Sequence, residues 1–292
     1  MLETWIVLSL AALLLYGAAQ VVNKSALQHI SAPSYILISA IIATPIWIIF
    51  LIAYLSINGS WGASLEYTAY GILASIFGIT GFYLFQEALQ RGPVTIVGSI
   101  TAAYPAIIVI VAIALLGETL TSIQAIGVVI IVAGMVALSY SHENSTGRKS
   151  LTKVALLLSI GTLILWGLWG IFAKIALEEL EVILYLGLSG FITPPIVFLY
   201  LRHRKSQGEV IVPKWSIAVI IAIIASEVGH IGFISETNAI SLGPATVVFP
   251  FIAAYPVVMI LLAYMFLKER LLKREMLLVL AVVVGIIFVS MV

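Results

Sequence analysis

The chain has 292 residues, of which 62% are hydrophobic and 9% are charged, and its formal net charge at pH 7 is +1. Soluble domains carry roughly 25% charged residues, so a water-soluble fold of this size would lack the polar side chains needed to cover its surface. The composition therefore predicts an integral membrane protein, and the near-neutral charge without a basic run excludes nucleic acid as a partner.

The residue types that are missing narrow the chemistry further. The chain has no Cys, and all 13 of its acidic residues are Glu, which excludes disulfides, thiolate metal sites and mechanisms built on an aspartate pair. No Gly-rich nucleotide-binding loop ending in Lys-Ser or Lys-Thr occurs, so ATP-driven transport is not predicted. The 4 His residues are too scattered for a zinc helix motif. We predict no cofactor and no bound metal.

Apolar runs of about 20 residues follow one another along the chain. Each can span a hydrocarbon core of roughly 30 Å, because a helix rises about 1.5 Å per residue. Counting the runs between polar breaks predicts an all-α integral membrane protein with ten transmembrane helices, over residues 4–23, 33–57, 67–90, 93–116, 121–141, 153–176, 181–201, 214–241, 244–267 and 273–291.

The most polar tract of the chain divides these helices five and five. We predict a first five-helix repeat over residues 1–141, a polar linker over 142–152 and a second five-helix repeat over 153–292. Each half then begins and ends with a membrane-spanning run.

The two halves carry the same residues in the same order. Gly92-Pro93 matches Gly243-Pro244, and Tyr104-Pro105 matches Tyr255-Pro256, in both cases 151 positions apart; in the early part of each half the offset is 150. A repeat of this length indicates a duplicated domain, not a solenoid. Because each copy has an odd number of helices, the second copy crosses the membrane in the opposite direction. The sequence therefore predicts two inverted repeats, an arrangement on which many secondary transporters are built.

The positive charges are distributed unevenly across the predicted layout. All of the 14 Lys and Arg residues except Lys174 fall on one side of the membrane. The positive-inside rule makes that side cytoplasmic, which predicts that both termini lie outside.

Several short motifs occur in an order that resembles a known family. They are the Gly-Pro turns, Leu116-Gly117-Glu118-Thr119-Leu120, and Trp166-Gly167-x-x-Gly170-x-x-x-Lys174 with its counterpart around Tyr16 and Lys24. Over essentially the whole chain, the sequence resembles the EamA-type transporters of the drug/metabolite transporter superfamily. The resemblance implies a ten-helix inverted-repeat fold, a central cavity, export or exchange of small metabolites or drugs, and cytoplasmic termini, the opposite of the charge-based orientation. The sequence departs from the family pattern at Tyr16, where Trp is usual, and in the second half, where Lys268 stands in place of Gly117.

Glu227 and His230 lie near the middle of predicted helix 214–241, where an ionisable group costs from about 3 to more than 10 kcal/mol. Their spacing of three residues places them on one helix face, and the first repeat has Ile76 and Ile79 at the matching positions. A buried Glu and a His that titrates near neutral pH suit proton coupling or the binding of a charged substrate. The alternative is a structural Glu–His hydrogen bond that locks two helices together.

Aromatic and amide side chains form a second set of candidates, because such groups bind amphipathic metabolites by stacking and hydrogen bonding. Glu87, near the end of helix 67–90, is expected either to share a cavity-facing surface with them or to reach interfacial water. Glu236 is expected to lie on the opposite helix face from Glu227 and to be solvated at its helix end. The remaining candidate substrate-binding residues are Tyr16, Gln20, Tyr83, Gln86, Tyr104, Trp166, Trp169 and Tyr255.

Charged residues at the helix ends are predicted to be structural. Lys24 and Lys174 are expected to extend towards the lipid headgroups. Glu118 and Glu269 each precede a predicted helix, where an acid complements the helix dipole.

The leading functional hypothesis is a secondary transporter, not an enzyme. It moves a small metabolite or drug-like molecule, amino-acid-like or amphipathic, by alternating access through a central cavity, with proton coupling through Glu227 and His230. Two alternatives stay open: a passive facilitator or pore, and an intramembrane enzyme that uses the same pair as acid and base. The predicted partners are the small-molecule substrate, protons and the lipid bilayer, and the predicted location is the plasma (inner) membrane, as a multi-pass protein.

Overall fold

The computed structural model of the protein describes residues 3–92, 94–143, 152–208, 215–267 and 273–291, and within these residues it contains helices and no strand. The helices are α1 (Thr4–Ala26), α2 (Ala32–Asn58), α3 (Leu65–Arg91), α4 (Val94–Thr101), α5 (Pro105–Leu115), α6 (Ser122–Glu143), α7 (Lys153–Ala176), α8 (Val182–Ser206), α9 (Ile217–Leu242), α10 (Ala245–Ala253), α11 (Tyr255–Leu267) and α12 (Lys273–Val289).

Two of the predicted spans are broken in the middle. The span predicted over 93–116 consists of α4 and α5, which meet at Tyr104-Pro105, and the span predicted over 244–267 consists of α10 and α11, which meet at Ala254. A proline lacks the backbone donor and its ring crowds the preceding turn, and both breaks lie beside the duplicated Tyr-Pro motif. Pro45, in contrast, lies within the continuous helix α2.

Among the described residues, eight helical stretches are long and apolar enough to cross a membrane: α1, α2, α3, α7, α8 and α9, together with Ile96–Leu115 and Ala245–Leu262. Within the described residues, α6 and α12 contain shorter apolar stretches, Ser122–Ala137 and Met276–Val289. The protein is therefore a multi-pass integral membrane protein, and the number of ten spans stays a prediction. The centre of the predicted linker, residues 144–151, lies outside the described residues.

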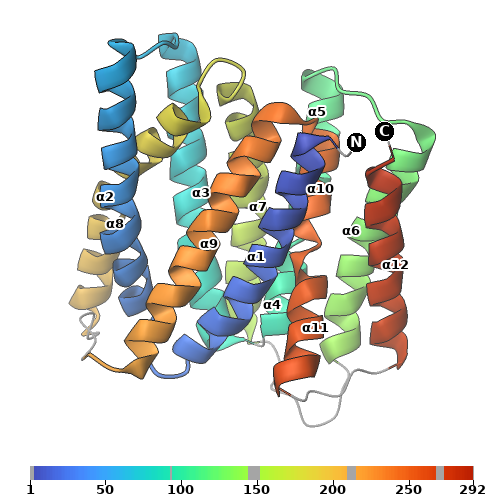
Figure 1. Cartoon of the computed structure of the whole chain (residues 1–292). Coiled ribbons are helices and arrows are strands. Elements are labelled where there is room, and N and C mark those ends of the chain that lie inside the picture. The colour runs from blue at the N-terminus through green and yellow to red at the C-terminus, as the bar shows by residue number, and fades with distance from the viewer. Residues whose placement is uncertain (1–2, 93, 144–151, 209–214, 268–272, 292) are drawn as a thin grey trace.

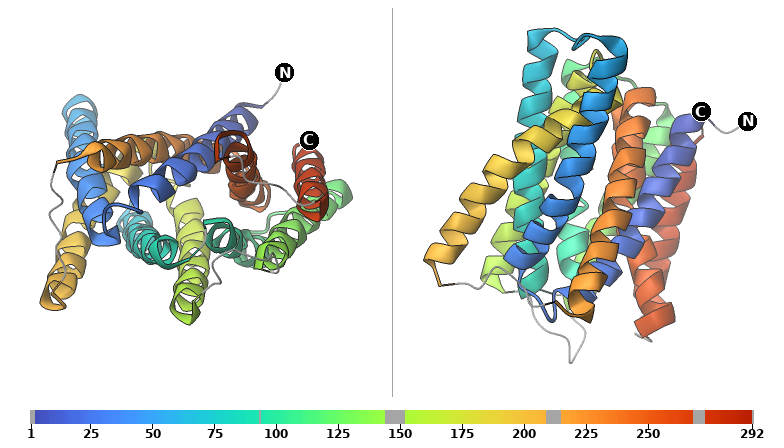
Figure 2. Two further views of the ribbon diagram at one scale, coloured as in Figure 1. Left: turned by 90° about the horizontal axis from the view of Figure 1, so that it is seen from below. Right: turned by 60° about the vertical axis from the view of Figure 1, so that its left-hand side comes forward.

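The helices pair across the two halves of the chain. α1 packs against α9 and α3 packs against α7, while α2 pairs with α8 and α6 with α12. Viewed along the helices, α1 and α9 form one row and α3 and α7 a second row, with the α2–α8 pair at one end and the α6–α12 pair at the other (Figure 2). Exchanging the two halves of the chain converts the α1–α9 pair into the α3–α7 pair and leaves the α2–α8 and α6–α12 pairs unchanged.

Equivalent helices of the two halves run in opposite directions. Both termini lie at the upper end of Figure 1, so α1 descends from that end while its counterpart α7 ascends towards it. Basic residues occupy the last turns of α1, α3 and α8, and these three helices all end at the lower end (Figure 1).

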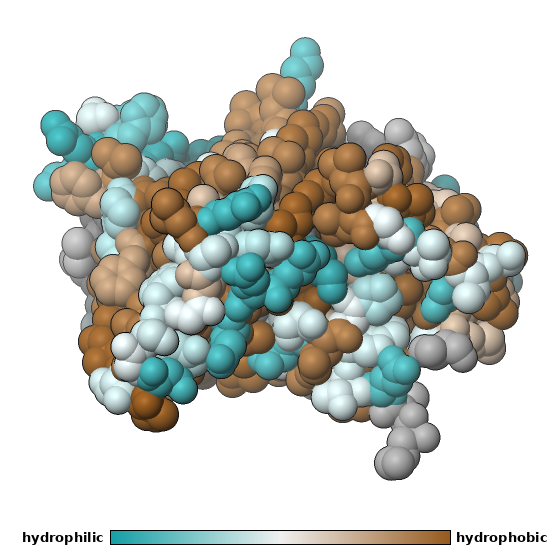
Figure 3. Space-filling model, turned by 90° about the horizontal axis from the view of Figure 1, so that it is seen from above, coloured by the Kyte–Doolittle hydropathy of each residue, from teal (hydrophilic) through white to brown (hydrophobic). Residues whose placement is uncertain are grey.

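The sides of the molecule are apolar. Large aliphatic side chains are exposed on the outer faces of several helices, as are Ile49 of α2, Ile110 of α5 and Leu199 of α8. Hydrophilic residues gather instead on the upper end of the molecule, where apolar residues border them (Figure 3). This distribution suits a protein whose sides contact lipid and whose ends contact water.

The two duplicated lysines cap helices of the same half instead of extending towards the headgroups. Lys24 Nζ donates to the carbonyl oxygens of Leu89 and Gly92 at the end of α3. Lys174 Nζ donates in the same way to Ile240 and Gly243 at the end of α9, at 3.0 and 2.8 Å. Each lysine therefore satisfies carbonyl groups that a helix end leaves without a partner.

Glu118 also has a structural role, but on a different helix from the predicted one. Its two carboxylate oxygens accept hydrogen bonds, each 2.8 Å long, from the backbone N–H groups of Ala245 and Thr246. It therefore caps the start of α10 in the other half of the chain, and not the helix that follows it in sequence. The matching prediction for Glu269 lies outside the described residues.

Candidate functional site

A cavity of about 220 Å³ lies between the two rows of helices. Its walls come from α1, α2 and α3 of the first half and α7, α8 and α9 of the second, with contributions from the breaks between α4 and α5 and between α10 and α11. Ligand pockets run from roughly 300 to 1,000 Å³, so this cavity suits a small solute.

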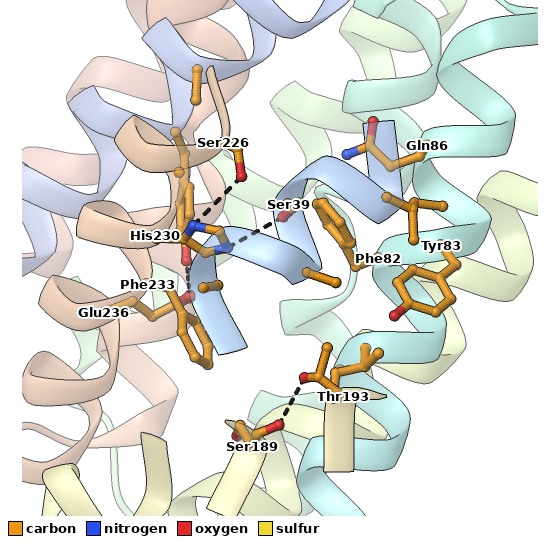
Figure 4. Close-up of a pocket in the computed structure, with 18 of the residues that line it drawn as sticks. Ser39, Phe82, Tyr83, Gln86, Ser189, Thr193, Ser226, His230, Phe233 and Glu236 are labelled. Carbon is orange, nitrogen blue, oxygen red and sulfur yellow. Dashed lines mark hydrogen bonds between the residues drawn. The ribbon is translucent and has the colours of Figure 1, made fainter. Parts of the chain in front are cut away.

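The structure brings most of the predicted site residues together on this cavity. Figure 4 shows part of its lining, with Tyr83 and Gln86 of α3 on one side and His230, Phe233 and Glu236 of α9 on the other. The predicted residues that line the cavity are Tyr16, Gln20, Tyr83, Gln86, Tyr104, Trp166, Trp169, His230 and Tyr255.

His230 and Glu227 contact each other as their spacing predicts, but only His230 lines the cavity. His230 Nδ1 lies 3.1 Å from Glu227 Oε1, and the Glu227 side chain is 33% exposed. The other ring nitrogen, Nε2, lies 3.3 Å from Ser39 Oγ of α2 (Figure 4). The hydrogen bond between Glu227 and His230 is thus internal to α9, and Ser39 provides the contact between helices.

Glu87 does not line the cavity, in contrast to the prediction. Its carboxylate accepts hydrogen bonds from Tyr200 and Arg204 of α8 and from Arg91 one turn later on α3. The side chain is 7% exposed. These contacts join the ends of α3 and α8, which pack against each other. Nothing in the sequence indicates that α8 approaches α3 at this position.

Glu236 is the acidic residue among the described cavity-lining residues, and the sequence interpretation missed it. It does lie away from Glu227, as the helical rotation predicts, but that side of α9 packs on α1, and Glu236 is 3% exposed and lines the cavity. Tyr16 Oη donates to Glu236 Oε2 at 2.6 Å, and the Tyr104 hydroxyl interacts with the same carboxylate. The prediction that Glu236 is solvated at its helix end is therefore wrong.

A signal for Glu236 is present in the duplication. The position equivalent to Glu236 in the first half is Phe85, 151 residues earlier, and the position equivalent to Tyr16 in the second half is Trp166, 150 residues later. Phe85 and Trp166 also contact each other, with ring centroids 5.1 Å apart. The apolar pair at the α3–α7 contact is thus replaced by a hydrogen-bonded polar pair at the equivalent α1–α9 contact, and both residues of the pair change together.

The hollow itself arises from a second difference between the halves. Gly78 of α3 packs against the Trp169 ring so closely that a Cβ at this glycine would come within 2.8 Å of the indole. The equivalent Gly229 of α9 faces Ala19, and a Cβ there would meet nothing nearer than the Ala19 methyl at 4.0 Å. The large ring of one half is replaced by a methyl group in the other, which leaves space for a ligand.

Hydrogen bonds between buried polar groups hold the cavity walls in place. Trp169 Nε1 donates to Tyr185 Oη at 2.9 Å, and Ser75 Oγ lies 2.8 Å from Ser189 Oγ. Asn23 Nδ2 donates to Gln86 Oε1 at 2.8 Å. Three buried polar atoms of the lining have no hydrogen-bond partner among the described residues, namely Asn23 Oδ1, Gln86 Nε2 and Tyr83 Oη. Buried polar atoms normally have hydrogen-bond partners, and a solute bound in the cavity is one source of partners for these three atoms.

Fold and site together define a multi-pass membrane protein with a solute-sized polar and aromatic cavity between two related halves. The EamA-like transporter family matches residues 3–140 and 153–291. This chain belongs to the EamA-like transporter family, and it is a membrane transporter of the drug/metabolite transporter superfamily.

Two further proteins are similar to this chain. The chain is 29% identical over 141 residues to "Uncharacterized protein MJ1333.1" of Methanocaldococcus jannaschii, an alignment that covers 48% of this chain and 100% of the archaeal protein. A solved structure described as "Crystal structure of protein" superposes with a TM-score of 0.71 at 17% identity, covering 99% of this chain and 96% of the other. At that identity the superposition shows a shared fold.

Proposed function

We propose that this protein is a secondary transporter that binds one small amphipathic molecule in the cavity between its halves and releases it by alternating access. The observation that carries the proposal is the position of the cavity. Its walls come from both halves, and it lies between the α1–α9 and α3–α7 rows, so a movement of one row against the other would change its access.

The duplication supports alternating access. Ten spans in two inverted five-helix repeats would give two states of similar energy, because exchanging the roles of the halves turns an opening on one side into an opening on the other. The opposite directions of α1 and α7 and the exchange of helix pairs between halves favour this arrangement. The breaks beside Pro105 and Pro256 provide two places where spans could bend, because the regular α-helical hydrogen bonding is already interrupted there.

Proton coupling is the second part of the proposal. His230 lines the cavity and contacts Glu227, so a proton on this pair would alter the charge beside a bound solute. Glu227 then acts through His230, since it does not itself line the cavity.

Transport in proteoliposomes tests the proposal. A panel of labelled amino acids, sugars and amines is offered to the wild-type protein and to Ala19→Trp, which places a large ring at the position equivalent to Trp169. We expect saturable uptake of at least one solute by the wild type and its loss in Ala19→Trp. The matched control is Leu14→Trp, because Leu14 is 49% exposed on α1 and a ring there leaves the cavity open. Uptake that persists in Ala19→Trp would contradict transport through this cavity.

An imposed pH gradient separates the alternatives. Accumulation above equilibrium in the wild type, lost in Glu227→Gln and His230→Gln, supports coupling. Equilibration without accumulation identifies a passive facilitator, and conversion of the solute to a new compound identifies an enzyme.

A further inference from the structure

The cavity contains a buried carboxylate without a cationic partner. Glu236 is 3% exposed, and none of the ion pairs found among the described residues includes it. The described residues that line the cavity include no Lys or Arg. A carboxylate removed from water is costly unless an opposite charge or strong donors compensate, and its neighbours Tyr16 and Tyr104 are neutral groups that bring no positive charge.

The surroundings of Glu236 are aromatic. The rings of Tyr16 and Tyr255 meet edge to face with centroids 6.3 Å apart, and the rings of Tyr104 and Trp166 lie 5.9 Å apart. All four side chains line the cavity. Aromatic faces attract organic cations through their negative π-electron density, so the rings and the carboxylate favour the same kind of ligand.

The opposite wall of the cavity supplies neutral hydrogen-bonding groups. Gln86 Nε2 and Tyr83 Oη are buried without a described partner, and Figure 4 shows both side chains across the cavity from Glu236. A solute can therefore place a cationic group at one wall and its polar remainder at the other. Because these atoms lack partners in the part of the chain that the structure describes, they indicate a ligand independently of the carboxylate.

The geometry points to a small organic cation, a protonated amine with an apolar or aromatic body, as the class of solute that this cavity binds. Its ammonium group contacts the Glu236 carboxylate and the faces of the neighbouring rings. This inference rests on the proposed function, since it names the substrate class of the same cavity.

A matched set of three compounds tests the inference by binding alone. The purified full-length protein in detergent is titrated with 2-phenylethylammonium, with the neutral 2-phenylethanol and with the anionic 3-phenylpropionate, and the dissociation constants are compared. We expect the wild type to prefer the ammonium to the alcohol by about tenfold or more, and not to bind the anion measurably, because a charged hydrogen bond and a cation–π contact are both lost in the alcohol.

Glu236→Gln is the decisive variant, because it keeps the size of the side chain and an oxygen that can accept the Tyr16 hydrogen bond. We expect its preference for the ammonium to fall to about twofold or less, since the amide carries no charge. The control is Glu178→Gln, which removes an exposed carboxylate beyond the end of α7 and is expected to keep the wild-type preference. Thermal unfolding of each variant shows that it is folded before it is titrated.

Each outcome decides the inference. An unchanged preference in Glu236→Gln, equal binding of the alcohol by the wild type, or failure of the ammonium to bind the wild type overturns it. Charge-selective binding without transport would uphold the cation site and contradict the proposed transporter. Transport that Ala19→Trp blocks but that shows no preference for cations would uphold the proposed transporter and contradict the cation site.

Discussion

The contacts of α3 with α7 and of α9 with α1 are equivalent under exchange of the halves, yet they enclose different surroundings. Where α3 meets α7, Trp169 covers Gly78 and Trp166 contacts Phe85. Where α9 meets α1, Gly229 faces only a methyl group, and Tyr16 donates to Glu236. Residues of both contacts line the cavity, but the first is filled at Gly78 by the Trp169 ring, whereas the second leaves space beside Gly229 and carries a carboxylate. Space for a ligand thus forms where Ala19 stands in place of a large ring like that of its counterpart Trp169.

The lysine caps at the ends of α3 and α9 are, in contrast, the same in both halves. Lys24 caps α3 and Lys174 caps α9, each through two backbone carbonyls at equivalent positions. This contrast separates the parts of the repeat that hold the fold from those that form the cavity, and it leads to four predictions about stability.

The largest loss is expected at the two lysine caps. Lys24→Met and Lys174→Met each keep an apolar stem but leave carbonyl groups without a donor, so each should lower the free energy of unfolding by about 3 kcal/mol. Unfolding in mixed detergent micelles measures the loss. Lys153→Met, at an exposed position at the start of α7, is the control and should have almost no effect. A large loss at only one of the two caps would show that the halves are not equivalent here.

The next largest loss of stability is expected at Gly78, and not at its equivalent Gly229. Gly78→Ala forces a methyl group against the Trp169 ring and should cost about 2 kcal/mol. Gly229→Ala has space for its methyl group and should change stability by less than about 0.5 kcal/mol, while it narrows the cavity. The same unfolding assay compares the two, and equal losses would contradict the assignment of the hollow to the α1–α9 side.

Glu118 links the two halves and should have a smaller effect. Glu118→Gln keeps an oxygen acceptor but removes the charge that faces the first N–H groups of α10, so stability should fall by about 1.5 kcal/mol. Because the interaction is partly screened by salt, the loss should be smaller at high ionic strength. A loss that does not depend on salt would indicate that geometry, not charge, dominates this cap.

The smallest loss of stability is expected at the hydrogen bond between Tyr16 and Glu236. Tyr16→Phe removes the hydroxyl that donates to Glu236 and should lower stability by about 1 kcal/mol. Tyr70→Phe is the matched control, since Tyr70 Oη donates to Glu66 at 3.1 Å at an exposed position, where a hydrogen bond contributes less. Equal losses in the two variants would show that the Tyr16 hydroxyl and the Glu236 carboxylate do not depend on each other.

Most of the predicted site residues do line the cavity, because aromatic and amide side chains at membrane depth need polar surroundings, although many other lining residues were not predicted. Tyr16, Gln20 and Trp169 were found in this way. Glu236 was not, because its position near a helix end suggests water, and only the packing of α1 and α10 over the end of α9 removes that water. Glu87 was misassigned for the opposite reason, since the end of α8 brings Arg204 and Tyr200 to it.

The sequence by itself determined that the protein lies in a membrane, that it is helical, and that its two halves share one ancestral pattern. Hydropathy and repetition are properties of residues along the chain, so they need no knowledge of contacts. Tertiary structure alone decided which carboxylate is buried, which helix Glu118 caps and where the hollow forms. Those properties depend on neighbours more than 100 positions away, as between Tyr16 and Glu236, and the environment of a charge is set by all the helices that pack around it.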